Sequence, residues 1–405
     1  MASIRHIPLS VILLAGVVIM FIVLGIRQTF GLFLNPISAD FGGGREVYAF
    51  AIGLQQIMWG VMQPVAGMIA DKYGPGRVIA VGGVLFAAGL YVMSESTTSG
   101  ALNLGGGFMI GSAMGAITFS VVLGAVGRMV PDEKRTMALS IVAGGCALGQ
   151  VAMVPAALGL LDEWGWRGAL VLLALASGLI VPCAAAFSGR PRTAPVEIQT
   201  MTLTAALTEA ARHKGYWLLS LGFIACGFQI TFVITHLPAH MADAGLPPSA
   251  AGSALMLLGV VNIVGNYIMG YMGTRWRKKY VLSGAYVLRS VVTTWYLATP
   301  VSETSTLIFI GIFGLTFLGT VPMTGALVAD IFGPRYMTSL FSIVYLMHQL
   351  AAFVGVWMGG VVFDATGSYD IMWEIAIAVG VLAAILHLPI PDTPLRPTAA
   401  AKPPA

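Results

Sequence analysis

Long apolar segments follow one another along nearly the whole chain, and this feature limits the possible folds most strongly. The chain has 405 residues, of which 57% are hydrophobic and only 9% charged, whereas soluble proteins carry about 25% charged residues. A helix needs about 20 apolar residues to cross a bilayer, so twelve such helices take up almost all of the length. The sequence therefore predicts an all-α integral membrane protein with no room for a separate soluble domain. We place the predicted transmembrane helices at residues 9–34, 47–70, 78–96, 101–127, 136–161, 166–187, 215–240, 249–273, 280–299, 304–328, 337–363 and 371–390.

One polar stretch divides these helices into two sets of six. It covers residues 188–214 and is rich in proline and basic residues, so we expect a cytoplasmic linker. Residues 1–187 are then predicted to form an N-terminal six-helix bundle and residues 215–390 a C-terminal one. The tail at residues 391–405 is rich in Pro and Ala and is predicted to be disordered.

Basic residues are distributed unevenly among the predicted loops. Of the 21 Lys and Arg residues, two lie inside predicted helices and only Arg45 and Arg167 lie in loops on the side opposite the N-terminus. Because positively charged loops stay in the cytoplasm, both termini are predicted to be cytoplasmic, in a multi-pass protein of the inner (plasma) membrane. The net charge of +4 is small, so no nucleic-acid partner is predicted. We expect a monomer surrounded by the lipid bilayer.

The two halves of the chain resemble each other at corresponding positions. Three pairs of matching residues, separated by 203, 200 and 202 residues, lie in the same types of loop. They are Gly67 and Gly270, Arg135 and Arg335, and Asp162 and Asp364. A nearly constant offset indicates a parallel internal repeat, which is a recurrent arrangement in transporters.

The loop after the second predicted helix, residues 67–77, reads GMIADKYGPGR. It resembles the signature loop of the major facilitator superfamily, which joins the second and third helices of that family. The resemblance implies two six-helix bundles around a central cavity that opens alternately to each side of the membrane. It also implies a gating function for this loop; the alternative is that its charges only anchor a short turn. The predicted gating residues are Gly67, Asp71, Lys72, Gly74, Arg77 and Arg128, the last as the partner of Asp71.

More narrowly, the chain resembles the monocarboxylate-transporter and oxalate/formate-exchanger branch of that superfamily. The residues that carry this resemblance are RQTFGLF at 27–33, the segment 150–155, and the pair at 348–349. In that branch the eighth helix commonly carries an arginine that binds the substrate carboxylate, often with an aspartate one turn before it. This chain has Asn266 and Asn262 there. Either the carboxylate anchor lies elsewhere, or the substrate is not a simple carboxylate.

Two arginines fall inside predicted helices, where charges are costly and usually functional. Arg27 lies in the outer half of the first helix and Arg289 near the middle of the ninth, whereas all 17 Asp and Glu residues lie in loops or close to helix ends. An anionic substrate would supply the missing partner, because a guanidinium holds a carboxylate through two parallel hydrogen bonds. Alternatively, Arg27 makes a structural contact near the outer interface, and Arg289 bonds to carbonyls of the eighth helix or to interfacial water.

His348 lies near the middle of the eleventh predicted helix. An unperturbed histidine titrates near physiological pH, so His348 is the candidate for proton coupling; the alternative is a neutral histidine satisfied by a neighbour. Other polar side chains in the helices either shape the site or bond one helix to another. Besides Arg27, Arg289 and His348, the predicted substrate-binding residues are Gln55, Gln150, Asn262, Asn266, Tyr345 and Gln349, with Gln56, Gln229, Trp59 and Phe119 as further candidates.

These features together predict a secondary transporter that works by alternating access. The expected substrate is a small organic anion such as a monocarboxylate, moved by proton symport or by anion antiport. The first rival is a multidrug or metabolite exporter of the same fold, which would often carry a buried acid. A weaker rival is a non-transporting membrane sensor, which would need an output domain. No enzyme, cofactor or metal site is predicted, because the sequence has no HExxH motif and no Walker loop.

Overall fold

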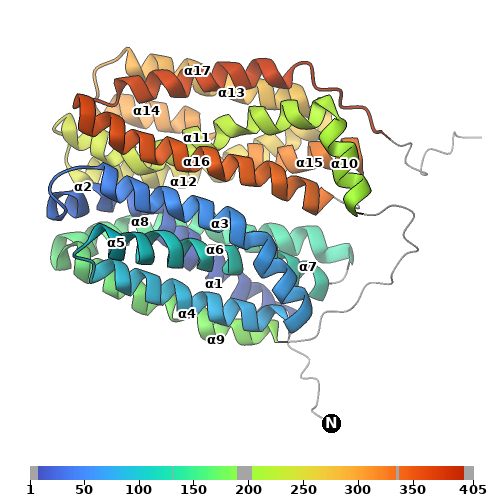
Figure 1. Ribbon diagram of the computed structural model, residues 1–405, viewed down its shortest axis with the longest axis horizontal. Coiled ribbons are helices and arrows are strands. Elements are labelled where there is room, and N and C mark those ends of the chain that lie inside the picture. Colours follow the sequence, from blue (N-terminus) through green and yellow to red (C-terminus); the bar gives the residue numbers. More distant parts are fainter. Residues whose placement is uncertain (1–7, 131, 189–202, 334–336, 396–405) are drawn as a thin grey trace, which may run out of the picture.

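The computed structural model describes residues 8–130, 132–188, 203–333 and 337–395, and these residues are mostly helical. Eight helical segments in this part are long and apolar enough to cross a membrane. The helices form two bodies that lie side by side with their long axes roughly parallel (Figure 1). The predicted all-α membrane architecture is therefore confirmed.

The N-terminal body contains the helices before residue 188, and α1 packs on α8 while α3 and α4 pack on α6. Its longest helix changes direction at Gly165, whose φ of 62° lies in a region that favours glycine. This break falls between the predicted fifth and sixth transmembrane helices. The helices are α1 (Leu9–Gln28), α2 (Phe30–Asp40), α3 (Glu46–Tyr73), α4 (Pro75–Ser94), α5 (Ser99–Leu102), α6 (Ile110–Ile117), α7 (Gly124–Met129), α8 (Asp132–Ser177) and α9 (Ile180–Ala184).

The C-terminal body follows the same plan, with α11 packed on α16 and α13 packed on α17. A short helix, α10 (Leu203–Arg212), precedes it. The helices of the body are α11 (Lys214–Asp243), α12 (Pro248–Arg275), α13 (Lys278–Leu297), α14 (Glu303–Gly314), α15 (Thr320–Phe332), α16 (Met337–Thr366) and α17 (Asp370–His387).

The structure differs from the sequence prediction at several places. The predicted helix 9–34 is divided at Thr29 into α1 and α2, and the predicted helix 101–127 contains α5, α6 and α7 with π-helical turns between them. The predicted helix 304–328 is interrupted, since α14 ends at Gly314 and α15 begins at Thr320. The described part of the predicted linker contains α10, because Ala206 and Ala210, one turn apart, are buried and give this segment an apolar face. Residues 189–202 of the linker and 396–405 of the tail lie outside the described residues.

The two bodies meet mainly through three helix pairs: α3 packs on α16, α8 on α12, and α2 on α11. The predicted repeat relates the second helix to the eighth and the fifth to the eleventh. It therefore relates α3 to α12 and α8 to α16. Under this relation the α3–α16 contact corresponds to the α12–α8 contact. This is the arrangement expected of two bodies related by an internal repeat.

Candidate substrate site and gate

Six side chains form a closed ring of contacts between the two bodies, about halfway along the long helices. They come from α1 and α3 of the N-terminal body and from α16 of the C-terminal body. We call this set the central ring: Arg27, Gln56, Trp59, Tyr345, His348 and Gln349.

Hydrogen bonds make up one side of the central ring. The Arg27 Nη2 donates to Gln56 Oε1 at 3.1 Å, and the backbone oxygen of Gln56 accepts from Gln349 Nε2 at 3.3 Å. Because the Gln349 amide nitrogen is used in this way, its Oε1 accepts from His348 Nδ1, which lies 3.1 Å away. His348 is therefore connected to Arg27 through two glutamines, one from each body.

Aromatic contacts make up the other side. The rings of His348 and Tyr345 stack with centroids 5.3 Å apart, and the edge of Tyr345 meets Trp59 at 6.1 Å. The guanidinium of Arg27 lies 5.3 Å from the centre of the Trp59 ring, which is within the range of a cation–π interaction. Trp59 is held in place by donating from Nε1 to Thr118 Oγ1 at 3.0 Å.

Arg27 is the charged member of the central ring, and its charge is not neutralised by the protein. It is half-buried, and within the described residues it forms no ion pair with a carboxylate. Its Nε has no hydrogen-bond partner and is buried. A buried donor without a partner is costly. An anion that accepted a hydrogen bond from this nitrogen would remove that cost, so the guanidinium can still bind an anion.

The space beside Arg27 is small in this conformation. A cavity of about 10 Å³ lies there, which is room for about one water molecule. It is lined by Arg27, Phe30, Ile52, Gln55, Gln56, Ile234 and Thr235. A substrate therefore needs the two bodies to move apart before it can reach the guanidinium from this direction.

The central ring contains four of the predicted site residues: Arg27, Tyr345, His348 and Gln349. Gln55 lies beside it, lining the small cavity and donating to the Gly106 oxygen at 3.0 Å. Gln150 is an inter-body contact, since it donates from α8 to the Leu255 oxygen of α12 at 3.0 Å. Its Oε1 accepts from Gln28, a buried residue that the sequence analysis did not single out.

The structure does not bring the other three predicted residues to the ring. Arg289 is fully buried within the C-terminal body and donates to the Thr316 hydroxyl and to the backbone oxygens of Thr316 and Phe317. Asn262 accepts from the Leu318 N–H at 3.2 Å and from Asn266 Nδ2 at 3.3 Å. These side chains satisfy backbone groups that the break between α14 and α15 leaves without helical partners. Their place in the substrate site therefore stays a prediction. Arg289 does bond to backbone oxygens, but these belong to the segment between α14 and α15 and not to the eighth predicted helix.

Replacing Arg289 by methionine is expected to destabilise the protein, because two backbone oxygens would remain buried without donors. Hydrogen bonds to charged groups contribute about 1.5–3 kcal/mol each, so we expect a fall of the thermal midpoint in detergent by about 5 °C or more. Arg275→Met is the matched control, since Arg275 is exposed and its guanidinium lies 4.9 Å from the centre of the Tyr271 ring. An Arg289→Met midpoint equal to that of the control would contradict this structural function.

A second cluster joins the bodies at the end of the molecule that carries the α2–α3 loop. Arg45 donates from Nη1 to Asp243 Oδ2 at 2.7 Å and from Nη2 to Asp243 Oδ1 at 2.6 Å. Its Nη1 also donates to the Tyr369 hydroxyl at 2.8 Å, and the guanidinium lies 3.6 Å from the Phe363 ring centre. Burial lowers the pKa of Arg45, but its bonds with Asp243 and Tyr369 outweigh burial and raise that pKa overall. The arginine is thus held as a cation.

The same cluster caps a helix across the interface. The carboxylate of Asp364 accepts from the N–H of Arg45 at 2.8 Å and from the N–H of Glu46 at 2.9 Å. These are the first backbone N–H groups of α3, which have no partner within their own helix. We call Arg45, Asp243, Asp364 and Tyr369 the Arg45 latch. It closes the α2–α3 end of the molecule.

Sequence reasoning missed the latch because Arg45 was counted only as an outer-loop charge and Asp364 only as a repeat position. The signal was present: Arg45 is one of only two basic residues on the predicted outer side, where such residues are rare. The partners could not be identified, because Asp243 and Tyr369 lie 198 and 324 residues from Arg45 along the chain and meet it only in the folded protein.

The predicted pairing in the signature loop is present. Arg128 Nη1 donates to Asp71 Oδ1 at 2.9 Å, and both side chains are partly exposed. This contact lies within the N-terminal body. Its gating function therefore remains a prediction.

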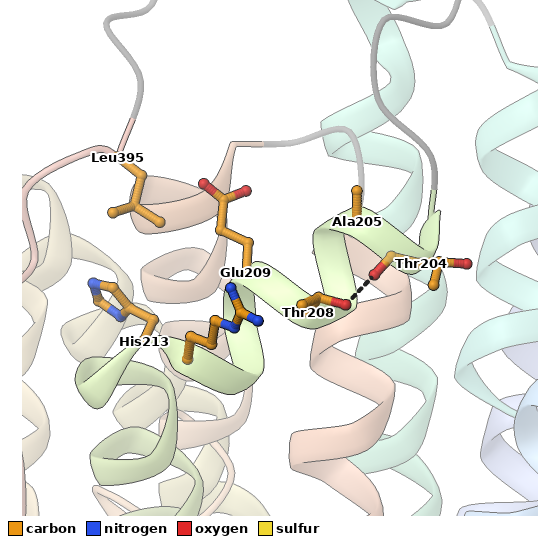
Figure 2. A pocket seen from close by; sticks show the side chains of 7 residues that line it. Thr204, Ala205, Thr208, Glu209, His213 and Leu395 are labelled. Carbon is orange, nitrogen blue, oxygen red and sulfur yellow. Dashed lines mark hydrogen bonds between the residues drawn. The ribbon is translucent and has the colours of Figure 1, made fainter.

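A larger hollow of about 650 Å³ lies at the opposite end of the molecule, where α10 meets the start of α11 and Leu395 (Figure 2). Thr208 donates to the Thr204 oxygen there, within α10. The hollow is wide open and is lined by residues of the C-terminal half only. We do not assign a substrate to it, since it is remote from the contacts between the bodies.

Comparison with known proteins shows which transporters the chain resembles. At 26% identity over 378 residues, the chain is similar to Monocarboxylate transporter 13 of Rattus norvegicus, covering 90% of this chain and 86% of the relative. It is 24% identical over 341 residues to the uncharacterized MFS-type transporter YhjX of Escherichia coli (strain K12), covering 82% and 83% of the two chains. The predicted resemblance to the monocarboxylate-transporter branch is thus confirmed.

Solved structures share the fold. A bacterial homologue of the human lysosomal transporter Spinster, inward-facing and occupied, has a TM-score of 0.74 at 16% identity, with 93% of this chain and 96% of that chain covered. A D-xylose–proton symporter has a TM-score of 0.72 at 15% identity, with 96% and 99% covered. The family model described as Major Facilitator Superfamily matches residues 16–265 and 219–404. The chain therefore belongs to the Major Facilitator Superfamily, a family of membrane transporters.

Proposed function

We propose that this protein is a secondary transporter of small organic anions, most simply of monocarboxylates. It works by alternating access in the plasma membrane, driven by proton symport or by anion exchange. The relatives named monocarboxylate transporters support the substrate class. The single observation that carries the proposal is Arg27, a guanidinium at the interface of the two bodies with a buried, unpartnered Nε and no carboxylate partner in the described part of the chain.

The proposed topology has twelve crossings in two six-helix bundles, with both termini in the cytoplasm. Eight segments are apolar enough to span, and one of them, Met137–Phe187, is long enough to cross twice around Gly165. The remaining crossings are α3, α13 and the pair α14–α15. In this topology the Arg45 latch lies on the outer face, so the structure is closed to the outside.

Alternating access then follows from the two ends of the molecule. When the latch opens, an anion enters from outside and binds the Arg27 guanidinium, which can form two parallel hydrogen bonds with a carboxylate. The latch closes, and the cytoplasmic end opens to release the anion. Asp71 and Arg128 would stabilise the state that is closed on the cytoplasmic side.

His348 is the proposed proton carrier. Its Nε2 is buried without a hydrogen-bond partner, while Nδ1 is bound to Gln349. The two glutamines of the central ring connect His348 to the substrate site at Arg27. Anion exchange would not need a proton carrier.

The direct test is uptake of radiolabelled lactate, pyruvate, formate and oxalate by proteoliposomes, with and without an inward proton gradient. We expect saturable uptake of at least one acid, and stimulation by the gradient indicates proton symport. Xylose and a cationic dye serve as controls for other substrate classes of this fold. Absence of uptake of every acid, under a gradient and in counterflow, by protein that is monodisperse in detergent would contradict the proposal.

A further inference from the structure

A second buried histidine lies directly behind the Arg45 latch. His236 belongs to α11, is fully buried, and lies against α16 where Gly359 leaves room for its ring. Its Nε2 is 2.8 Å from the Val356 oxygen, and its Nδ1 is 3.1 Å from the Tyr369 hydroxyl. His236 therefore touches the latch through the same hydroxyl that Arg45 uses.

The partners of His236 determine which nitrogen carries the hydrogen in the neutral ring. A backbone oxygen can only accept, so Nε2 donates to Val356. The Nδ1 of a neutral ring is then an acceptor, and it receives the hydrogen of Tyr369. Burial raises the pKa of Tyr369, so this hydrogen is retained, and the phenol oxygen remains free to accept from Arg45. With a neutral histidine, Arg45 donates to Tyr369, Tyr369 donates to His236, and His236 donates to the backbone oxygen of Val356, so that every hydrogen in this series has an acceptor.

A second proton on His236 would disrupt this series of hydrogen bonds. The protonated ring donates from both nitrogens, so the Tyr369 oxygen would face N–H donors from His236 and from Arg45, and its own hydrogen would lose its acceptor. Two cations would also share one hydroxyl in a buried place, where like charges repel strongly.

Other charged groups near His236 do not remove this conflict. Asp243 uses both carboxylate oxygens to hold Arg45, and Asp364 uses both to cap α3. His240, one turn further along α11, contacts the Tyr369 ring edge-on, and Asp370 begins α17. Of these groups, only Tyr369 is in hydrogen-bond contact with the His236 ring.

We propose that His236 is a proton-sensitive switch of the outer gate: proton uptake by its ring releases Arg45 and opens the α2–α3 end. A ligand shifts a conformational equilibrium toward the state that binds it better, and the proton binds better to the unlatched state. External acid thus favours the outward-open form. This inference rests on the proposed function only in assigning the latch to the outer face of a transporter.

The test measures opening rather than transport. Spin labels are placed on Ser99→Cys and Ser249→Cys, two exposed positions on different bodies at the α2–α3 end, in a background without the three native cysteines. Double electron–electron resonance of the protein in nanodiscs then reports the distribution of distances between the two labels at pH 8 and at pH 5. We expect the ratio of the long-distance to the short-distance population to rise about tenfold on acidification, which corresponds to a shift of about 1.4 kcal/mol toward the unlatched form.

Variants identify the group that responds. His236→Gln keeps a donor for Val356 and an acceptor for Tyr369 but cannot be protonated, so its ratio should change less than about twofold. The matched control His240→Gln should retain the tenfold response, and Arg45→Gln should be open at both pH values. If His236→Gln does not fold, Tyr369→Phe removes the link between histidine and latch and should also abolish the response.

Three results would overturn the switch: no acid response in the parent, a full response in His236→Gln or Tyr369→Phe, or loss of the response in His240→Gln. Because no substrate is used, a failure to transport carboxylates leaves this result unaffected. The switch and the proposed substrate class can therefore fail independently.

Discussion

Replacing Arg27 by glutamine should reduce carboxylate uptake at low substrate concentration by about 100-fold or more. Glutamine is short and neutral, and the variant loses the charge-assisted hydrogen bonds to the anion, each of which contributes about 1.5–3 kcal/mol. Every 1.4 kcal/mol corresponds to a factor of ten, so two lost bonds account for the expected effect. Initial rates in proteoliposomes, corrected for the amount of inserted protein, provide the measurement.

Stability distinguishes this effect from misfolding. Arg27 is a half-buried charge without a counter-ion, so its removal should leave the thermal midpoint unchanged or raise it. Substrate should stabilise the wild type against heat but not Arg27→Gln, because ligand binding to the native state raises its stability. Arg289→Met should show the opposite pattern, with a lower midpoint. Arg27→Lys keeps the charge but loses the planar fork, and should fall between wild type and glutamine. Normal uptake by well-inserted Arg27→Gln would refute the proposed anion site.

Hydropathy was sufficient to predict an all-α membrane protein, because a bilayer forces long apolar helices on any chain that crosses it. Interruptions of single helices were not predictable in the same way. The break between α14 and α15 contains no proline within residues 315–319. It is stabilised by Arg289 and Asn262, which come from other helices. Such a break depends on tertiary partners that a local apolar pattern does not reveal.

The candidate site was partly predictable for a related reason. Arg27 and His348 stand out because ionisable groups are rare in transmembrane helices, and the structure brings both into the central ring. The same rule also selected Arg289, since the cost of burying a charge is the same whether a substrate or a backbone oxygen offsets it. His236 was overlooked although it also lies within a predicted helix. Only its contact with Tyr369 distinguishes it from a packed histidine, and Tyr369 lies 133 residues further along the chain.

Replacing Gly31 by valine should prevent the outer end from closing and reduce transport to about one tenth of wild type or less. Gly31 lies on α2 against α11 of the other body, where an added Cβ would lie 2.1 Å from the Ile234 oxygen. A backbone atom cannot move aside as a side chain can, so the two bodies must separate. Overpacking of this kind costs about 1–3 kcal/mol, which shifts a two-state equilibrium by roughly tenfold or more. Transport would fall because alternating access requires both closed forms.

The location of the clash determines how this variant should differ from other glycine substitutions. Gly284 of α13 has no atom within 4 Å of an added Cβ, so Gly284→Val should transport normally. Gly227 approaches the His348 oxygen within the C-terminal body, so Gly227→Val should lower the thermal midpoint without favouring either access state. Gly31→Val should remain folded. Of the three variants, it alone should show the long distance between labels at residues 99 and 249 at both pH 8 and pH 5. A short distance in Gly31→Val would mean that α2 and α11 can separate while the Arg45 latch stays closed, and the outer gate would then be the latch by itself rather than the whole interface.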